Sequence, residues 1–146
     1  MAMNRPSYKI ISIEDLRSTL QEVFSLFPEI MIAYLYGSYA NNNQNEFSDV
    51  DVGIVINESE RSKTFDILGI GAQIEKKFNY EIELDLRILN DCPPRFLHQV
   101  LKNGFLLYNV NNSFKDEFEL RVITEYLDIK PILDSFDQRT IVRSLE

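Results

Sequence analysis

Residues 30–56 read IMIAYLYGSYANNNQNEFSDVDVGIVI, and they carry the strongest structural signal in the chain. Two short apolar runs, 30–36 and 50–56, flank a polar connection, and both runs are rich in β-branched and aromatic residues. Runs of this length and composition, bounded by turn-forming residues, predict two mostly buried strands. The sequence therefore predicts a strand, a Gly-Ser turn followed by a connection, and a second strand that opens at Asp49-Val50-Asp51.

Two carboxylates are predicted at the start of the second strand. Side chains alternate along a strand, so Asp49 and Asp51 share one face while Val50 points to the other. Two carboxylates at the start of a buried strand repel each other and lose hydration, and a bound divalent cation removes both of these costs. Mg²⁺ is commonly shared between one or two carboxylates and substrate phosphates. Gly37 and Ser38 provide backbone N–H groups and a hydroxyl that suit a phosphate. If the two strands are antiparallel, this turn faces the aspartates.

A third carboxylate fits the same site. Residues 80–89 alternate between apolar and polar side chains, which predicts a strand with Asp85 and Arg87 on its polar face. Residues 62–78 have the apolar spacing of a helix, so the strand at 50–56, this helix and the strand at 80–89 form a βαβ unit. The two strands are then parallel neighbours, and Asp85 is expected to join Asp49 and Asp51.

The pattern GSx10DxD, followed by a strand with a later aspartate, resembles the nucleotidyltransferase superfamily that includes DNA polymerase beta. Within it the chain resembles the minimal nucleotidyltransferases of the MntA antitoxin family. The segment LDLRILN at 84–90 stands where that family has the strand of its third aspartate, and segments 104–108 and 125–133 are also similar to family segments. The likeness covers most of the chain. It implies an α/β (α+β) fold with a small mixed β-sheet, like the polymerase beta palm, and flanking helices.

The resemblance also implies a chemistry. Members of this family transfer AMP from ATP to a tyrosine of a partner HEPN-domain ribonuclease toxin and so neutralise it. In this chain, Asp49, Asp51 and Asp85 would be the catalytic residues and would hold two Mg²⁺ ions, with Asp85 also expected to accept the proton of the incoming hydroxyl. Gly37 and Ser38, with Asp49 and Asp51, would bind the nucleotide. Two alternatives stay open: nucleotidyl transfer to a small molecule such as an aminoglycoside, and a non-catalytic module that blocks its toxin by contact.

Composition limits the other possibilities. At 146 residues the chain is expected to form a single nucleotidyltransferase domain, 1–146, with a loose terminus at 1–8. The formal charge of −8 and the lack of a Lys/Arg cluster argue against a directly bound nucleic acid. Cys92 is the single cysteine, which excludes a disulfide framework and fits the cytoplasm. Neither a signal peptide nor an apolar run long enough for a membrane span is visible.

The remaining segments are predicted as support for the sheet. Helical spacing predicts a helix that Ser12 caps, and a second helix that the Pro93-Pro94 pair opens. A short strand is expected at 105–108. The C-terminal segment 113–146 is expected to form two helices, one capped by Ser113 and one that starts at Pro131. Their apolar residues have two interpretations, cover for the sheet or a surface that docks a partner.

Overall fold

The computed structural model describes residues 9–41, 44 and 49–145, with side chains through residue 137. A four-stranded sheet in the order β3-β2-β1-β4 forms its centre. The strands are β1 (Ile30–Tyr36), β2 (Val50–Ile56), β3 (Leu84–Ile88) and β4 (Phe105–Asn109). β1 pairs antiparallel with β2 and with β4, while β2 and β3 are parallel. The predicted pairings of the strands at 50–56 are therefore confirmed.

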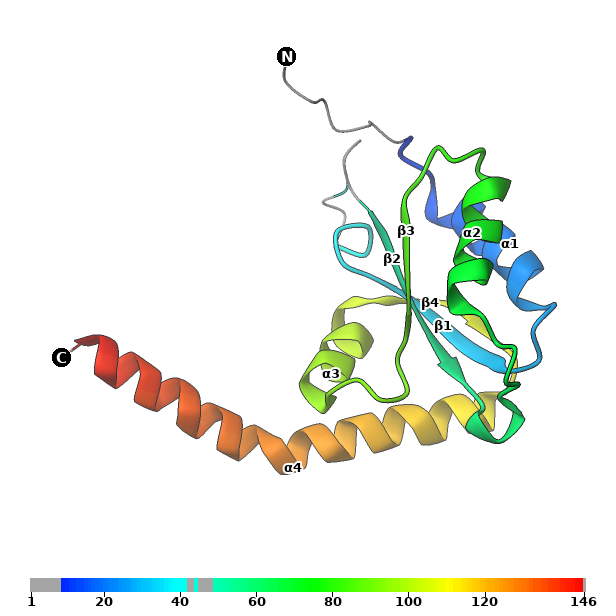
Figure 1. The fold of residues 1–146 in the computed structure, drawn as a ribbon. Coiled ribbons are helices and arrows are strands. Elements are labelled where there is room, and N and C mark those ends of the chain that lie inside the picture. The colour runs from blue at the N-terminus through cyan, green and yellow to red at the C-terminus, as the bar shows by residue number, and fades with distance from the viewer. Residues whose placement is uncertain (1–8, 42–43, 45–48, 146) are drawn as a thin grey trace, which may run out of the picture.

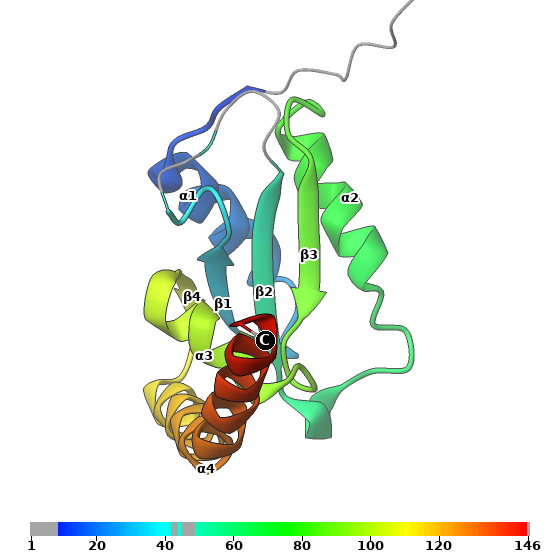
Figure 2. The ribbon, with the colours of Figure 1, turned by 90° about the vertical axis from the view of Figure 1, so that its left-hand side faces the viewer.

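Helices cover both faces of the sheet. α1 (Ile13–Phe24) and α2 (Ile67–Lys77) lie on one face, whereas α3 (Pro94–Asn103) and the first part of α4 (Asn112–Leu145) lie on the other (Figures 1 and 2). Val50, Val52 and Ile54 point into the core under α1 and α2. Tyr34 and Val55 point into the second core, under α3 and α4. The side chains of β2 therefore alternate between the two apolar cores, one on each face of the sheet.

Local signals set most helix ends. The Ser12 hydroxyl accepts a hydrogen bond from the Asp15 N–H at 3.1 Å, which is the predicted cap of α1. α3 begins at Pro94, and the missing N–H of proline costs nothing there because the first N–H groups of a helix have no partner within the helix. Gly104 follows the last residue of α3. A Cβ on Gly104 would overlap the carbonyl oxygens of Val100 and Leu35, so only glycine lets the chain pass this close to β1.

Two predicted boundaries are wrong. β3 starts at Leu84 and not near residue 80, because Asn79 and Tyr80 have positive φ values of 55° and 58° and end the preceding helix in a left-handed turn. α2 starts at Ile67 and not at residue 62, because a 3₁₀ turn, Glu58–Glu60, and a further turn come first. The expected terminus at 1–8 lies outside the described residues.

The C-terminal segment is one helix of 34 residues and not two. Asn111, rather than Ser113, caps it, since the Asn111 side-chain oxygen accepts a hydrogen bond from the Phe114 N–H at 3.1 Å. Pro131 lies inside the helix, where it removes one backbone donor, and the helix bends along its orange section in Figure 1. Among the described helices, none is both long and apolar enough to span a bilayer.

Candidate active site

Tyr36, Asp51 and Asp85 form a row across three strands. Tyr36 of β1 is the direct partner of Asp51 of β2, and Asp51 is the direct partner of Asp85 of β3. Directly opposed residues point to the same face of a sheet. The row lies at the edge where β1 ends and β2 begins, on the face that α3 and α4 cover further along the strands. Asp85 therefore lies beside Asp51, on the same face, as expected for a carboxylate that joins the site.

The environment of Asp51 strongly disfavours its charged form. Burial makes the largest contribution, followed by the charges of Asp85 and Asp49 and by a hydrogen bond with Asp85, while Arg87 acts in the opposite direction. Together these raise the Asp51 pKa from 3.8 to about 6. Two carboxyl groups that share a hydrogen bond require a proton between them, or a cation in its place.

Asp49 stands slightly apart from this pair. It is exposed and precedes β2, but its charge still acts on Asp51. Within the described part of the chain, the side chains as placed do not form a group of three or more His, Cys, Asp or Glu residues able to hold a metal ion. The predicted site formed by Asp49, Asp51 and Asp85 for two Mg²⁺ ions therefore stays a prediction. Its donor set fits the ion, since Mg²⁺ takes one or two carboxylates and completes its shell with waters and phosphates.

Gly37 lies directly against the Asp51 carboxylate. Its φ is +74°, and a Cβ at this position would overlap Asp51 Oδ2. The Gly37 carbonyl accepts hydrogen bonds from the N–H groups of Ala40 and Asn41, each at 3.1 Å, which closes the turn that contains Ser38. A glycine is therefore required here both by conformation and by space. The role of Gly37 and Ser38 in binding nucleotide stays a prediction, and residues 42–43 and 45–48 of the connection, Ser48 among them, lie outside the described residues.

Two residues extend the site beyond those predicted. The Tyr36 hydroxyl is buried and has no hydrogen-bond partner in the described structure; burial, with the charges of Asp51 and Asp85, raises its pKa to about 12 although Arg87 lowers it. The Tyr36 ring meets Phe96 edge-on at 5.5 Å. The Arg87 guanidinium lies 5.3 Å from the same ring, and its Nη2 is 4.0 Å from Asp85 Oδ2.

Part of this arrangement was visible in the sequence. The alternation of residues 80–89 places Arg87 on the face of Asp85, although no role follows from the alternation alone. Tyr36 is the last residue before Gly37, yet a strand pattern does not show which of its tyrosines has an unsatisfied hydroxyl. His98, the single histidine, stacks on Tyr126 at 3.8 Å between α3 and α4, so it belongs to the helix packing.

Comparison with known proteins agrees with this geometry. The sequence profile of the family described as "Polymerase beta, Nucleotidyltransferase" matches residues 18–113. The protein adenylyltransferase MntA of Aphanizomenon flos-aquae (strain 2012/KM1/D3) is 30% identical over 132 residues, which cover 85% of this chain and 87% of that protein.

Solved structures share the fold at lower identity. A toxin-antitoxin structure with AMP-PNP has a TM-score of 0.68 and 16% identity, over 90% of this chain and 99% of that chain. A chain in the structure of the tri-AMPylated HEPN toxin of Shewanella oneidensis in complex with MNT antitoxin has a TM-score of 0.66 and 14% identity. The match covers 89% of this chain and 99% of that chain. The mixed four-stranded sheet with flanking helices is thus the polymerase beta-like nucleotidyltransferase fold.

Proposed function

The chain belongs to the polymerase beta nucleotidyltransferase family, and we propose that it is an antitoxin that transfers AMP from ATP to a tyrosine of a partner HEPN ribonuclease toxin. The observation that carries this proposal is the placement of Asp51 and Asp85 side by side, with the Gly37 turn against them. The name of the 30% identical relative, a protein adenylyltransferase, supports the choice of reaction. The toxin-antitoxin complexes that share the fold support the choice of partner.

The carboxylates would hold the ions. Asp49 and Asp51 would bind two Mg²⁺ ions together with the triphosphate, and Asp85 would contact one of them. Bound Mg²⁺ would neutralise phosphate charge and polarise the attacking oxygen. Without an ion, burial and the neighbouring carboxylates raise the pKa of Asp51, and a bound cation would lower it again because it favours the ionised carboxylate.

The chain's own groups would order the rest of the reaction. The tyrosyl oxygen of the toxin attacks the α-phosphorus, the bond to diphosphate breaks, and diphosphate leaves. A tyrosine has a pKa near 10 in water, so its proton needs an acceptor at neutral pH, and Asp85 would be that acceptor. The Gly37 turn and the Ser38 hydroxyl would hold the departing phosphates. Arg87 beside Asp85 would limit the negative charge at the site.

The cellular setting follows from the substrates. ATP and a ribonuclease toxin occur together in the cytoplasm, so we place the reaction there. The acidic balance of the chain, 23 Asp and Glu against 15 Lys and Arg, does not favour direct contact with RNA. The toxin, and not its nucleic acid, is therefore the expected macromolecular ligand.

The test combines the purified chain, the partner toxin, ATP and Mg²⁺, and measures the toxin by mass spectrometry. We expect an adenylyl increment on a toxin tyrosine and loss of ribonuclease activity. The Asp49→Asn, Asp51→Asn double variant should bind the toxin but add nothing. Neutralisation without any increment would favour blocking by contact. ATP turnover with an aminoglycoside in the absence of toxin would favour the small-molecule alternative.

A further inference from the structure

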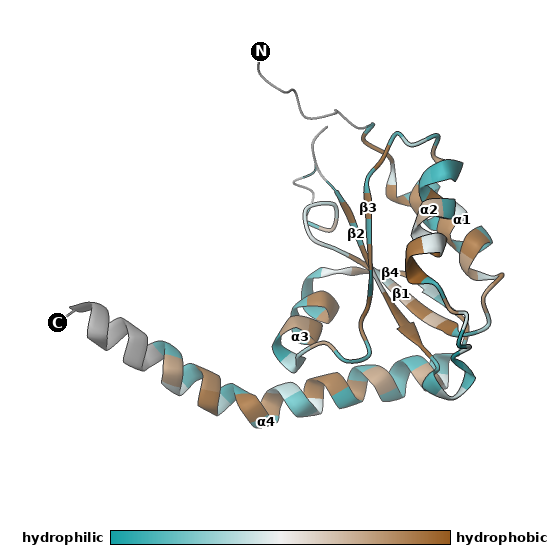
Figure 3. Cartoon of the chain, in the orientation of Figure 1, coloured by the Kyte–Doolittle hydropathy of each residue, from teal (hydrophilic) through white to brown (hydrophobic). Residues whose placement is uncertain are grey.

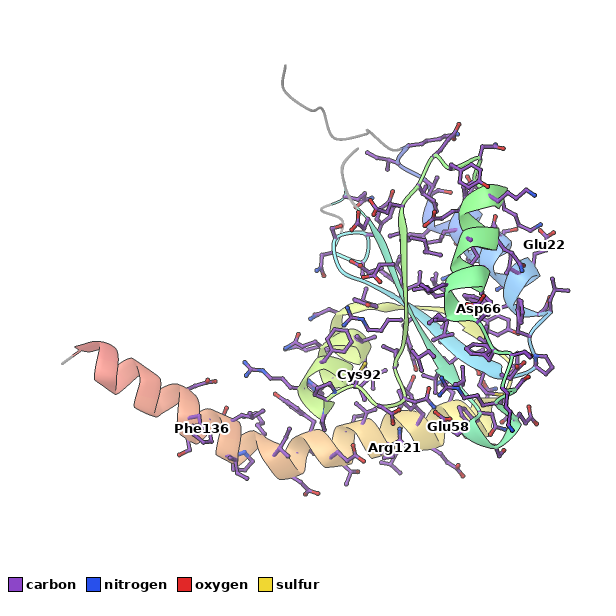
Figure 4. All side chains as sticks on the ribbon, viewed as in Figure 1. Glu22, Glu58, Asp66, Cys92, Arg121 and Phe136 are labelled. Atoms are coloured by element: carbon purple, nitrogen blue, oxygen red, sulfur yellow. The ribbon has the colours of Figure 1, made fainter. Side chains whose placement is uncertain are left out.

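The second half of α4 projects away from the rest of the molecule. Figure 1 shows it extending beyond α3, and Figure 2 shows its end pointing at the viewer. Figure 4 labels Phe136 on this projecting part, whereas Arg121 lies where the helix runs under the sheet. Figure 3 shows hydrophobic bands continuing along the projection. The side chains of residues 129, 132, 133 and 136 are apolar, and we call them the distal face.

The distal face continues a stripe that is buried in the first half of the helix. Phe118 and Val122 are 6% and 0% exposed in the core under the sheet. Further along, Ile129 and Leu133 are only half-buried, and Ile132 and Phe136 are each 58% exposed. A stripe of apolar side chains that is buried in one half of a helix and exposed in the other half indicates a surface that another element covers.

The spacing of the stripe indicates what kind of element it would contact. Positions 122, 126, 129, 133 and 136 are separated alternately by four and three residues, and all are apolar or aromatic. This repeat of 3.5 residues is the pattern by which one helix packs lengthwise against another. Within the body, α3 already packs against α4 in this region, through His98 on Tyr126. The distal face continues this apolar stripe beyond α3, where a helix of another molecule can pack against it.

Charge favours the toxin as the source of that helix. The sequence of α4, 112–145, has seven acidic and five basic residues, and the whole chain carries a formal charge of −8, so the helix projects from an acidic molecule. A ribonuclease must bind a polyanion and so carries basic surface. Acidic and basic surfaces attract each other and speed association, whereas two copies of this chain, each with a formal charge of −8, would repel each other.

The direction of the projection also suits a protein acceptor. α4 leaves the body on the α3 side of the sheet, which is the face that carries Tyr36, Asp51 and Asp85 (Figures 1 and 2). A protein that packs on the distal face would therefore stand on the same side of the sheet as the carboxylates. Transfer to a protein tyrosine requires the acceptor to be held on that side.

We infer that the distal face of α4 binds a helix of the partner toxin and holds the toxin on the carboxylate side of the sheet. This inference rests on the proposed function for the identity of the partner. It assigns α4 a double role: the first half completes the core, and the second half recruits the acceptor.

The test uses two matched pairs of substitutions in the full chain. Ile132→Gln with Phe136→Gln removes apolar surface from the distal face, and Ile123→Gln with Leu127→Gln is the control. Leu127 is 58% exposed, like Ile132, and lies about 140° around the helix from it. Each pair is spaced by four residues, and glutamine keeps helix propensity high.

Toxin affinity is measured by calorimetry, and adenylylation kinetics by mass spectrometry. We expect the distal pair to raise the Kd and the KM for toxin roughly 10- to 100-fold, with kcat at saturating toxin and ATP affinity unchanged. The control pair should change the Kd and the KM for toxin by less than about 3-fold. Equal effects of the two pairs, or none from the distal pair, would overturn the inference.

Two further outcomes separate this inference from the proposed function. If the chain binds toxin through the distal face but adds no adenylyl group, the docking surface stands and the proposed activity fails. If the distal pair adenylylates toxin with an unchanged KM, the activity stands and the docking surface fails. Sedimentation of the chain alone provides a last check, because a dimer that the distal pair converts to monomers would identify a second copy as the occupant and overturn the inference.

Discussion

Replacing Asp51 by Asn should stabilise the metal-free protein while abolishing transfer of AMP. The folded protein holds the Asp51 pKa at about 6, above its ordinary value of 3.8, because the carboxyl group is partly buried beside Asp85 and Asp49. A group with a raised pKa contributes its full stability below the unfolded value and loses that stability as the pH rises through the folded value. The neutral amide of Asn does not ionise, so the variant escapes this loss.

The size of the effect follows from the shift. A pKa that is raised by about two pH units corresponds to a loss of about 3 kcal/mol in the free energy of unfolding. Because Asp51 is partly exposed, solvent screening reduces this loss to roughly 1–2 kcal/mol. For a chain of 146 residues, each kcal/mol moves the melting temperature by about 2–4 °C. At pH 8 and without divalent cations, Asp51→Asn should therefore melt roughly 2–8 °C higher than the unmodified chain.

Calorimetric melting from pH 4 to pH 8 in EDTA checks this reasoning. The difference between the two proteins should be small at pH 4, grow through pH 6 and then level off. Mg²⁺ at pH 8 should raise the melting temperature of the unmodified chain more than that of the variant. Asp91→Asn, at an exposed aspartate, is the control and should shift melting by less than about 1 °C. A difference that is independent of pH, or a less stable Asp51→Asn at pH 8, would refute the account of the carboxyl pair.

Three other substitutions test neighbouring parts of the sheet. Gly37→Ala should lower stability by about 1–3 kcal/mol and weaken ATP binding, because the backbone has a φ of +74° and the new Cβ meets Asp51; urea unfolding and nucleotide titration measure both effects. Tyr36→Phe should leave stability equal or up to about 1 kcal/mol higher in the same unfolding assay, since it removes a buried hydroxyl without a partner. Asn90→Ala should cost about 1–3 kcal/mol, because the Asn90 side chain bonds the Ile56 N–H at 2.9 Å and its carbonyl at 2.8 Å.

Short-range patterns in the sequence predict the central sheet well. The bounds of β1 and β2 follow from apolar runs that end at a glycine turn and at an asparagine. The position of Asp85 beside Asp51 follows from alternation together with the rule for parallel crossovers. These inferences succeed because each depends on residues close in sequence or on a strong topological preference.

The wrong predictions concern elements whose bounds depend on tertiary context. Pro131 normally signals a helix start, but its cost is local, about 3 kcal/mol, and a long helix anchored by Phe118 and Val122 continues through it. The late start of β3 depends on the left-handed conformations of Asn79 and Tyr80, which asparagine favours but tyrosine does not. A sequence pattern does not show these outcomes, because they depend on how each segment packs in the folded chain.

Three features of the site lie close together in the structure. The Tyr36 hydroxyl lacks a partner, Gly37 has a left-handed backbone, and Asp51 is held beside a second carboxyl group. The hydroxyl without a partner and the close carboxyl pair are locally unfavourable, Gly37 leaves no space for a Cβ, and all three lie in one corner of the sheet. Proteins tolerate such conflicts where the surrounding core is strong and where a ligand relieves them. A bound cation would relieve the repulsion at Asp51, so the unfavourable carboxyl pair of the free protein and the proposed chemistry have the same origin.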